Sequence, residues 1–310
     1  MSLSDEMNNH ALDVVILTED RYLKLDTSEW YEAQIATEDG LVAQALAARG
    51  LTVGRVSWSD PAFCWRDTRA ALFRSTWDYF HRFAEFSPWL DAAATQTRLL
   101  NPAELVRWNL DKRYLRDLSR AGVSVVPTRY ADVGEQHTLA AIMDAEGWDE
   151  VVFKPVVSGA ARLTYRVGRD TLEAHEAVFA RCLAAEAMMV QRFEPAVLGE
   201  GELSLIVIEG RTTHAIRKTA AAGDFRVQDD HGGTVHAHQP RAEERAFAEA
   251  AIAACPSLPL YARVDFVRAG DGGFRLMELE LVEPELFFRF HPPAADALAD
   301  ALAQRLKSGD

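Results

Sequence analysis

The chain has few cysteines and no long hydrophobic segment. Cys64, Cys182 and Cys255 lie far apart among 310 residues, a spacing that fits neither a disulfide framework nor a CxxC metal site. We expect them to be buried thiols in a reducing compartment. No apolar run approaches the roughly 20 residues of a membrane-spanning helix, and residues 1–13 lack the basic and apolar regions of a signal peptide. These absences predict a cytoplasmic globular protein whose first residues form a loose tail.

The chain also lacks an excess of positive charge. It has 33 lysines and arginines against 47 aspartates and glutamates, which gives a net charge of −14. A nucleic-acid-binding domain normally presents a basic face, so general binding of nucleic acid is not expected. Internal repeats and low-complexity segments are absent as well. A chain of this length and composition is expected to fold into two or three packed units.

Hydrophobic periodicity predicts an α/β unit in residues 1–101. Its predicted elements are strands at 13–17, 51–56 and 70–74, a helix at 38–49 capped by Gly50, and an aromatic-rich helix around 83–90. The first two strands and the helix between them form a βαβ unit.

The rest of the chain is predicted to form a second unit at 102–194 and a third at 195–310. The second unit has predicted helices at 111–121, 138–146 and 171–185 and strands at 123–127, 151–154, 163–167 and 187–191. The third has predicted hairpins at 203–208 with 212–219 and at 260–268 with 274–281, backed by helices at 241–254 and 293–307. The fold class is therefore α/β in the first unit and α+β beyond it.

The most informative stretch is the second of these hairpins. Alternation places Arg263 and Asp265 on one face of its first strand, and Glu278 and Glu280 on one face of its second. If the glycine-rich turn closes near residue 271, Asp265 lies opposite Met277 or Glu278, and opposed residues on one face are roughly 5 Å apart.

Three carboxylates that close together raise each other's pKa, so water, Arg263 or a cation must neutralise them. A hard dication such as Mg²⁺ suits oxygen ligands best. The alternative is a solvated face on which Arg263 pairs with one glutamate.

Two further segments could bind a nucleotide. Lys154 ends the apolar strand and precedes the small-residue loop 157–162, where backbone N–H groups could approach phosphate oxygens and the lysine would add charge. The apolar strand 188–194 runs into a linker whose main chain could hydrogen-bond an adenine edge. An ordinary strand connection and a plain core strand are the alternatives.

Other cations and histidines follow in the third unit. Arg217 and Lys218 point to opposite faces of one strand, so at most one of them faces a given site, and Arg226 lies farther on. His236 and His238 share a face, but no third ligand follows at a useful spacing. We therefore expect the histidines to be exposed strand residues and not a transition-metal site.

The order of these features resembles the ATP-grasp superfamily over nearly the whole chain. The order comprises Lys112, Lys154-Pro155 before the small-residue loop, the linker Gln191 to Glu194, and Asp265 with Glu278-x-Glu280. Segments 74–79, 109–115 and 278–286 further resemble the glutathione-synthetase-like branch that includes the cycloserine-biosynthesis ligase.

The resemblance implies a division of the fold into three parts. These are a Rossmann-like pre-grasp domain (1–101), a small subdomain with the lid and the adenine strand (102–194), and a large antiparallel-sheet subdomain with the metal carboxylates (195–310).

The resemblance also implies a role for each motif. Lys112 and Lys154 would contact ATP phosphates, and the loop Ser158 to Arg162 with Gly159 would form the lid. Adenine would be held by Gln191, Arg192 and Phe193. The ribose would be bound by Glu202 or Glu200. Asp265, Glu278 and Glu280 would bind Mg²⁺, with Mn²⁺ as the alternative ion. Two departures stand out, because the family commonly has Glu-x-Asn at 278–280 and a lid richer in glycine.

The implied activity is an ATP-dependent ligase that forms a C–N bond. A small, amino-acid-like carboxylate would attack the γ-phosphorus, and an amine would displace phosphate from the acyl phosphate. Positioning and electrostatics suffice for the phosphoryl transfer, so the absence of a Ser/His/Asp or Cys/His signature is no objection.

Residue types suggest which side chains would handle these substrates. The predicted catalytic residues are Arg217, Lys218 and Arg226, the two arginines as forks for the substrate carboxylate. Arg74, Trp77, Asp78 and Tyr79 follow a strand's carboxyl end, where open α/β sheets bind ligands, and with Arg263 they are the predicted substrate residues. Aromatic packing between domains is the alternative for the segment 74–79.

The expected partners are small-molecule substrates, without nucleic acid or membrane, and a homodimer is left open. Three other functions compete with a small-molecule ligase. The chain could bind ATP as a sensor without turnover, add amino acids to a protein tail, or phosphorylate a hydroxyl group. The acidity of the chain and the lack of a docking extension argue against the second of these.

Overall fold

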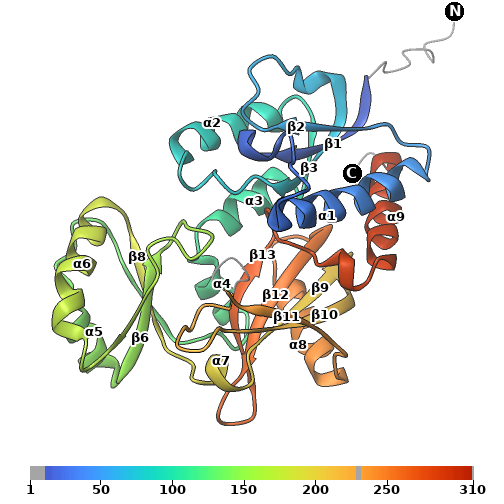
Figure 1. The fold of residues 1–310 in the computed structure, drawn as a ribbon. Helices are drawn as coiled ribbons and strands as arrows, with labels where there is room; N and C mark the ends of the chain where they lie inside the picture. The colour runs from blue at the N-terminus through green and yellow to red at the C-terminus, as the bar shows by residue number, and fades with distance from the viewer. Residues whose placement is uncertain (1–10, 228–231, 309–310) are drawn as a thin grey trace, which may run out of the picture.

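The computed structural model describes residues 11–227 and 232–308 as three sheets with flanking helices (Figure 1). The predicted loose tail at the start of the chain lies largely outside the described residues. In the part of the chain that is described, no helix is long and apolar enough to cross a bilayer.

The first sheet is parallel, in the order β2-β1-β3-β4. Its strands are β1 (Leu12–Thr18), β2 (Val53–Ser57), β3 (Thr68–Ser75) and β4 (Arg98–Leu100), and its helices are α1 (Trp30–Ala47) and α2 (Phe83–Ala94). Short 3-10 helices follow β1 at η1 (Asp20–Tyr22) and precede β3 at η2 (Trp65–Asp67). The central strands are almost fully buried, which explains their continuous apolar runs.

Helix α1 begins earlier than predicted, at Trp30 instead of residue 38. Its buried face includes Glu38 and Asp39 beside Ile35 and Val42. These two acidic residues interrupt the apolar stripe from which a helix is recognised, so the pattern indicated only its second half.

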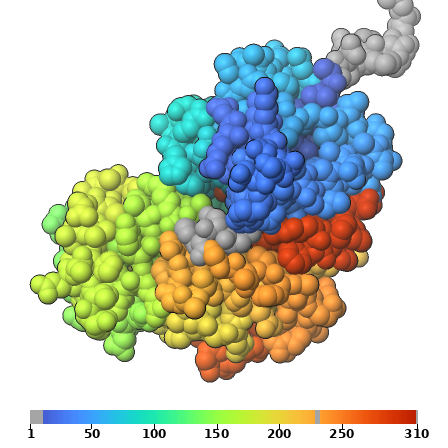
Figure 2. Space-filling view, viewed as in Figure 1, coloured from blue at the N-terminus to red at the C-terminus, as the bar shows by residue number. Residues whose placement is uncertain are grey.

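The middle sheet is antiparallel, in the order β5-β8-β6-β7, and is covered by α5 and α6. The elements are β5 (Thr128–Ala131), α5 (Leu139–Glu146), β6 (Glu150–Pro155), β7 (Tyr165–Gly168), α6 (Leu172–Ala185) and β8 (Met188–Arg192). Figure 2 shows this unit, in green and yellow-green, as a lobe at one side of the molecule.

The third sheet is antiparallel, in the order β11-β10-β9-β12-β13. The strands are β9 (Glu202–Ile208), β10 (Arg211–Thr219), β11 (Thr234–His238), β12 (Tyr261–Arg268) and β13 (Phe274–Glu280), and the helices are α7 (Ala196–Gly199), α8 (Ala242–Ala253) and α9 (Pro293–Ser308), with a 3-10 helix η4 (Phe288–Phe290). Both predicted hairpins are confirmed. Helix α9 packs on α1, so the end of the chain joins the first unit to the third.

The predicted helix at 111–121 is wrong in its first part. Two helices, α3 (Ala103–Leu110) and α4 (Tyr114–Arg120), flank a bend in which Asp111 is extended, and Lys112 lies in that bend. The backbone N–H of Lys112 donates to the carbonyl of Val156 at 2.8 Å. This bond ties the bend to the end of β6 and so places Lys112 beside the loop after that strand.

The predicted strand at 123–127 is also wrong, because β5 starts at Thr128. Residues before it run along the edge of β13 instead, where Val126 N donates to Leu276 O and Leu276 N to Ser124 O. Pro127 has no N–H for a ladder, which separates the two stretches. Helices α3 and α4 pack into the core of the third sheet, while the three-part domain division stays a prediction.

The cysteine prediction fails at one position. Cys64 is exposed in the connection between β2 and β3, whereas Cys182 and Cys255 are partly buried, and all three are free thiols. Cys64 is exposed because the connection runs over the surface at this residue, although the neighbouring Trp65 is buried.

Glu19, directly after β1, should make stability depend on pH. Burial raises its pKa from 4.5 to about 7, and the nearby charge of Asp78 adds to the rise. The folded protein therefore holds this proton where the unfolded chain has lost it, so the stabilising contribution is full below pH 4.5 and is lost as the pH rises through 7.

We therefore expect Glu19→Gln to increase the free energy of unfolding relative to wild type at pH 8 and to change it little at pH 4. Urea unfolding of both proteins at these two pH values measures the difference. A difference that does not vary with pH would contradict the assignment.

Candidate active site

Two adjoining cavities lie where the three units meet. The first lies between the middle and third sheets, and the second between the first unit and the third sheet. They share six lining residues, which are Lys112, Ser158, Gly159, Ala160, Glu278 and Glu280. A group bound in one cavity would therefore touch a group bound in the other across this shared border.

The first cavity brings together most of the predicted nucleotide residues. Its lining includes Lys112, Lys154, Ser158, Gly159, Gln191, Arg192, Phe193 and Glu202. Apolar side chains such as Val152, Phe225 and Met277 complete the wall, which suits a flat ring. Glu200 is exposed after α7 and is not part of this lining, so of the two ribose candidates only Glu202 reaches the cavity.

The loop after β6 is bent by backbone conformations that usually favour glycine. Ala160, Ala161 and Leu163 all have φ near +50°, at 47°, 53° and 47°. Gly159 lies so close to the first unit that an added Cβ would come within 2.6 Å of the Phe80 ring. The resemblance identifies this loop as the lid. Residues 158–160 of the loop form part of the shared border, although the loop contains few glycines.

The register of β12 and β13 confirms the predicted carboxylate hairpin. Asp265 pairs with Glu278, and Arg263 pairs with Glu280. Two carboxylates, Glu278 and Glu280, reach both cavities, whereas Asp265 is only 2% exposed and lines neither. The third carboxylate therefore sits behind the other two.

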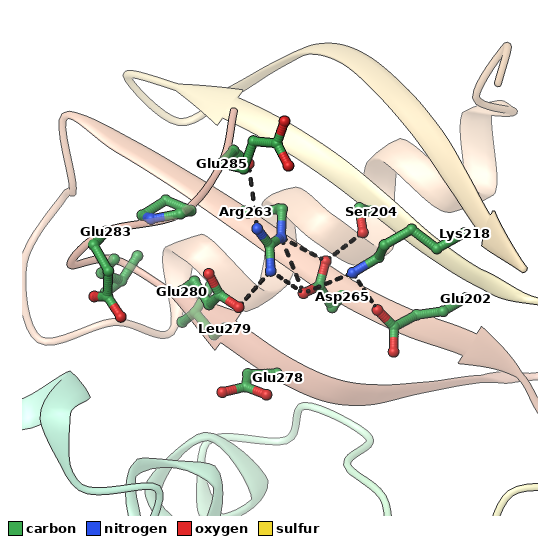
Figure 3. A network of polar contacts seen from close by, with 12 residues as sticks. Glu202, Ser204, Lys218, Arg263, Asp265, Glu278, Leu279, Glu280, Glu283 and Glu285 are labelled. Atoms are coloured by element: carbon green, nitrogen blue, oxygen red, sulfur yellow. Dashed lines mark hydrogen bonds and ion pairs between the residues drawn. The ribbon is translucent and has the colours of Figure 1, made fainter. Parts of the chain in front are cut away.

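Cations neutralise these acidic groups, and Figure 3 shows Arg263 between Asp265 and Glu280. Glu278 pairs with Lys112 at 2.9 Å and with Lys154 at 3.4 Å. Arg263 pairs with Asp265 at 3.0 Å and also with Glu280.

A third lysine completes the cluster. Lys218 pairs with Glu202 at 2.5 Å and with Asp265 at 3.4 Å, and Ser204 donates to Asp265. Four cations thus face four carboxylates, and this balance makes their burial tolerable.

The ion pairs set the protonation states. Burial would raise the pKa of Glu278, but Lys112 and Lys154 hold it well below its usual range. Burial likewise opposes the charged form of Lys112, yet Glu278 keeps the pKa of this lysine above its ordinary value. At Glu280 burial outweighs the opposing effect of Arg263, with the charges of Asp265 and Glu278 adding to the rise, and the pKa reaches about 7.

The carboxylates at the shared border are candidate ligands for a magnesium ion. Oxygen atoms of Glu278 and Glu280 at the shared border are hard ligands of the kind that Mg²⁺ prefers. Within residues 11–227 and 232–308, however, no group of three or more acidic, histidine or cysteine side chains is arranged to hold a metal ion. The residues therefore fit the ion chemically, provided that the carboxylates exchange their lysine and arginine partners for it.

The predicted catalytic cations are separated by the sheet. Lys218 lines the second cavity and Arg226 the first, where Asp224 holds its guanidinium at 2.7 Å. Arg217 is exposed on the opposite face and lies 3.4 Å from His238, so it reaches neither cavity. His236 is exposed as expected, whereas His238 is partly buried against Glu244.

The predicted substrate residues divide in the same way. Trp77, Tyr79 and Arg263 line the second cavity. Two others reach neither of the two cavities. Arg74 is buried and donates to the carbonyl of Pro284 at 3.0 Å, and Asp78 accepts from Trp58 at 2.6 Å.

Sequence reasoning missed several lining residues. They include Phe225 in the first cavity and Tyr31, Asn109, Glu283, Glu285 and Phe287 in the second. A signal existed for two of them, because Glu283 and Glu285 continue the acidic pattern of Glu278 and Glu280. Tyr31 comes from a distant part of the chain and carries no local signal, and Asn109 lies in the segment 109–115, which supported the resemblance without giving this residue a role.

Comparisons with known proteins agree with this geometry. The model of the N-terminal domain of D-cycloserine synthetase DcsG matches residues 14–101. The cycloserine biosynthesis protein DcsG of Streptomyces lavendulae is 36% identical over 283 residues, which cover 85% of this chain and 92% of that protein.

Solved structures also show similarity to DcsG. A crystal structure of D-cycloserine synthetase DcsG aligns with a TM-score of 0.81 at 32% identity and covers 94% of this chain and 99% of that one. The D-alanine–D-alanine ligase from Bacillus anthracis complexed with ATP shares the fold, with a TM-score of 0.67 at 15% identity over 96% and 98% of the two chains. From the match with the Streptomyces protein, the chain belongs to the ATP-grasp family that includes DcsG, and it is an ATP-dependent ligase.

Proposed function

We propose that the chain binds ATP in the first cavity and an amino-acid-like carboxylate in the second, and joins that carboxylate to an amine through an acyl phosphate. The observation that carries the proposal is the shared border, where Lys112, Glu278 and the loop 158–160 line both cavities. A carboxylate in the second cavity would meet there the terminal phosphate of a nucleotide in the first. Such proximity supplies much of the rate of a phosphoryl transfer.

Binding would proceed by an exchange of ion partners. Lys112 and Lys154 would leave Glu278 for the phosphates, while Glu278, Glu280 and Asp265 would hold Mg²⁺, or Mn²⁺ in its place. The ion when bound would reduce the negative charge that repels an attacking carboxylate. Lys218 and Arg263 both line the second cavity. They would then be able to turn toward the substrate carboxylate.

Two bond exchanges complete the reaction. A substrate carboxylate oxygen attacks the γ-phosphorus, and the bond from that phosphorus to the bridging oxygen breaks to release ADP. The amine nitrogen then attacks the acyl carbon, phosphate leaves, and the nitrogen loses a proton. The similarity to D-cycloserine synthetase DcsG supports one specific form, in which carboxylate and amine belong to one molecule and close a cycloserine-type ring.

The acyl phosphate can be trapped. We expect ADP release to depend on a carboxylate substrate, and hydroxylamine added to the reaction to yield the hydroxamate of that substrate, detected by mass spectrometry. Candidate amino acids, singly and with amines, form the screen.

ATP binding without ADP release across this screen would favour a sensor, and a stable phosphorylated hydroxyl product would favour a kinase. A peptide substrate is the remaining alternative, for which PsnB, complexed with a precursor peptide, offers a precedent in the same fold at 18% identity and a TM-score of 0.62.

A further inference from the structure

The second cavity has aromatic walls and an acidic rim. Tyr31, Trp77, Tyr79 and Phe80 line it from the first unit, and Phe287 lines it from the segment after β13. Its charged lining residues are Lys112, Lys218, Arg263, Glu278, Glu280, Glu283 and Glu285. Carboxylates therefore outnumber cations around this cavity by one.

Glu283 accounts for this difference in number, because the other three glutamates are paired. Glu278 pairs with lysines, Glu280 pairs with Arg263, and Glu285 pairs with Arg289. The carboxylate of Glu283 makes no ion pair with any residue that the structure describes, and in Figure 3 it points away from the guanidinium of Arg263. A carboxylate that faces a cavity without a cation is a site at which a positively charged group gains most.

The backbone around Glu283 is held in place by side chains of two units. Trp77 donates to the carbonyl of Glu283 at 3.0 Å, and Arg74 donates to that of Pro284 at 3.0 Å. Arg263 donates to the carbonyl of Glu285 at 3.3 Å. Three successive carbonyls are thus anchored, so the backbone that carries the Glu283 side chain is held in place before a ligand arrives.

The raised pKa of Glu283 agrees with the lack of an ion-pair partner for its carboxyl group among the described residues. Burial raises the pKa of Glu283 to about 8, the charge of Glu280 adds to the rise, and Lys112 opposes it. A cation close to the carboxylate would offset this penalty. Trp77 and Phe287 line the same cavity, and the guanidinium groups of Arg263 and Arg289 already lie 5.8 and 5.1 Å from the centre of the Phe287 ring, so this ring is an aromatic surface that attracts cations.

We propose that Glu283, with the rings of Trp77 and Phe287, forms a binding site for the ammonium group of the substrate in the second cavity. The substrate class is therefore an amino acid in which a charged amine accompanies the reacting carboxylate. This inference rests on the proposed function for the assignment of that cavity to substrate, but it makes a separate claim about charge.

Two ligands and two proteins test the claim. The ligands are D-cycloserine, which carries an amino group, and isoxazolidin-3-one, the same ring without it. Calorimetry at pH 7 with Mg²⁺ and a non-hydrolysable ATP analogue measures both with wild type and with Glu283→Gln. We expect the amino group to strengthen binding on the order of tenfold or more in wild type, and less than about threefold in the variant. Glu283→Asp keeps the charge and should recover part of the difference.

The same titrations separate the two proposals. Binding of the ATP analogue tests the nucleotide cavity, and Glu283→Gln should leave that binding and the melting temperature unchanged. An amino-group effect of equal size in wild type and variant, or no such effect in wild type, would overturn the ammonium site even if the nucleotide binds. Loss of nucleotide binding by wild type would instead count against the proposed function.

Discussion

Replacement of Lys112 by methionine is expected to lower the rate of ADP release by a factor on the order of 10² to 10³, the usual cost of removing one preorganised charged donor from a reacting centre. Lys112 is 6% exposed, lines both cavities and donates to the carbonyl of Ser158 in the border loop. No other lysine lines both cavities among the residues that the structure describes. Methionine keeps the length and apolar stem of the side chain, so the lost charge accounts for most of the change.

The control for this variant is Lys24→Met, which removes an exposed lysine outside both cavities. Lys112→Met also leaves Glu278 with a single partner, Lys154, and should lower stability for that reason. The double variant Lys112→Met, Glu278→Gln should recover stability without recovering activity. ADP release near the wild-type rate in folded Lys112→Met would remove this lysine from the mechanism.

Replacement of Glu38 by alanine is expected to destabilise the protein strongly, by about 3–5 kcal/mol, the range measured when one partner of a buried ion pair is removed. Glu38 is buried in α1, and its carboxylate accepts the backbone N–H groups of Phe288 and Arg289, each at 2.9 Å. It also lies 3.8 Å from the buried guanidinium of Arg74. Alanine would leave that guanidinium and both N–H groups short of a partner.

Urea unfolding measures this effect, with Glu29→Ala as the control on the exposed start of the same helix. Because Glu38 and Arg74 hold the segment that carries Glu283 and Glu285, residual folded Glu38→Ala should also bind substrate more weakly while ATP affinity changes less. A loss of stability no larger than that of Glu29→Ala would show that this contact between the first and third units contributes little.

Local patterns predicted the parts of the site that lie on regular elements. The alternation of β12 and β13 gave the register of Asp265 and Glu278, because pleated strands fix which side chains share a face. Lys154 was found because a charged residue at the end of an apolar strand needs a partner, which proved to be Glu278.

The remaining features depend on contacts between distant segments. Lys112 was expected in a helix, yet a hydrogen bond to Val156 holds it in a bend. Arg74 was expected to select a substrate, yet Glu38, Asp39 and the carbonyl of Pro284 occupy it. A sequence shows that such a cation must be paired, but only the fold shows with which group.

Which cation neutralises the carboxylates could likewise not be predicted from the sequence. The sequence is compatible with neutralisation by Mg²⁺ or by Arg263, and in the structure Arg263 and the lysines pair with the acidic groups. The roles of Asp265, Glu278 and Glu280 toward a metal stay predictions. Their test must separate loss of the ion from release of the lysines, since both follow when a glutamate is neutralised.

The proposal that the lysines leave the carboxylates for phosphate while Mg²⁺ takes their place is tested most directly by the Mg²⁺ dependence of ATP binding. Calorimetry with and without Mg²⁺ measures this dependence for wild type and for the double variant Glu278→Gln, Glu280→Gln. We predict that Mg²⁺ strengthens binding at least about tenfold in wild type. In the double variant the ratio should approach one, because the lysines are already free for phosphate while the ion has lost its ligands. An equal Mg²⁺ effect in both proteins, or no ATP binding by folded wild type, would contradict the account.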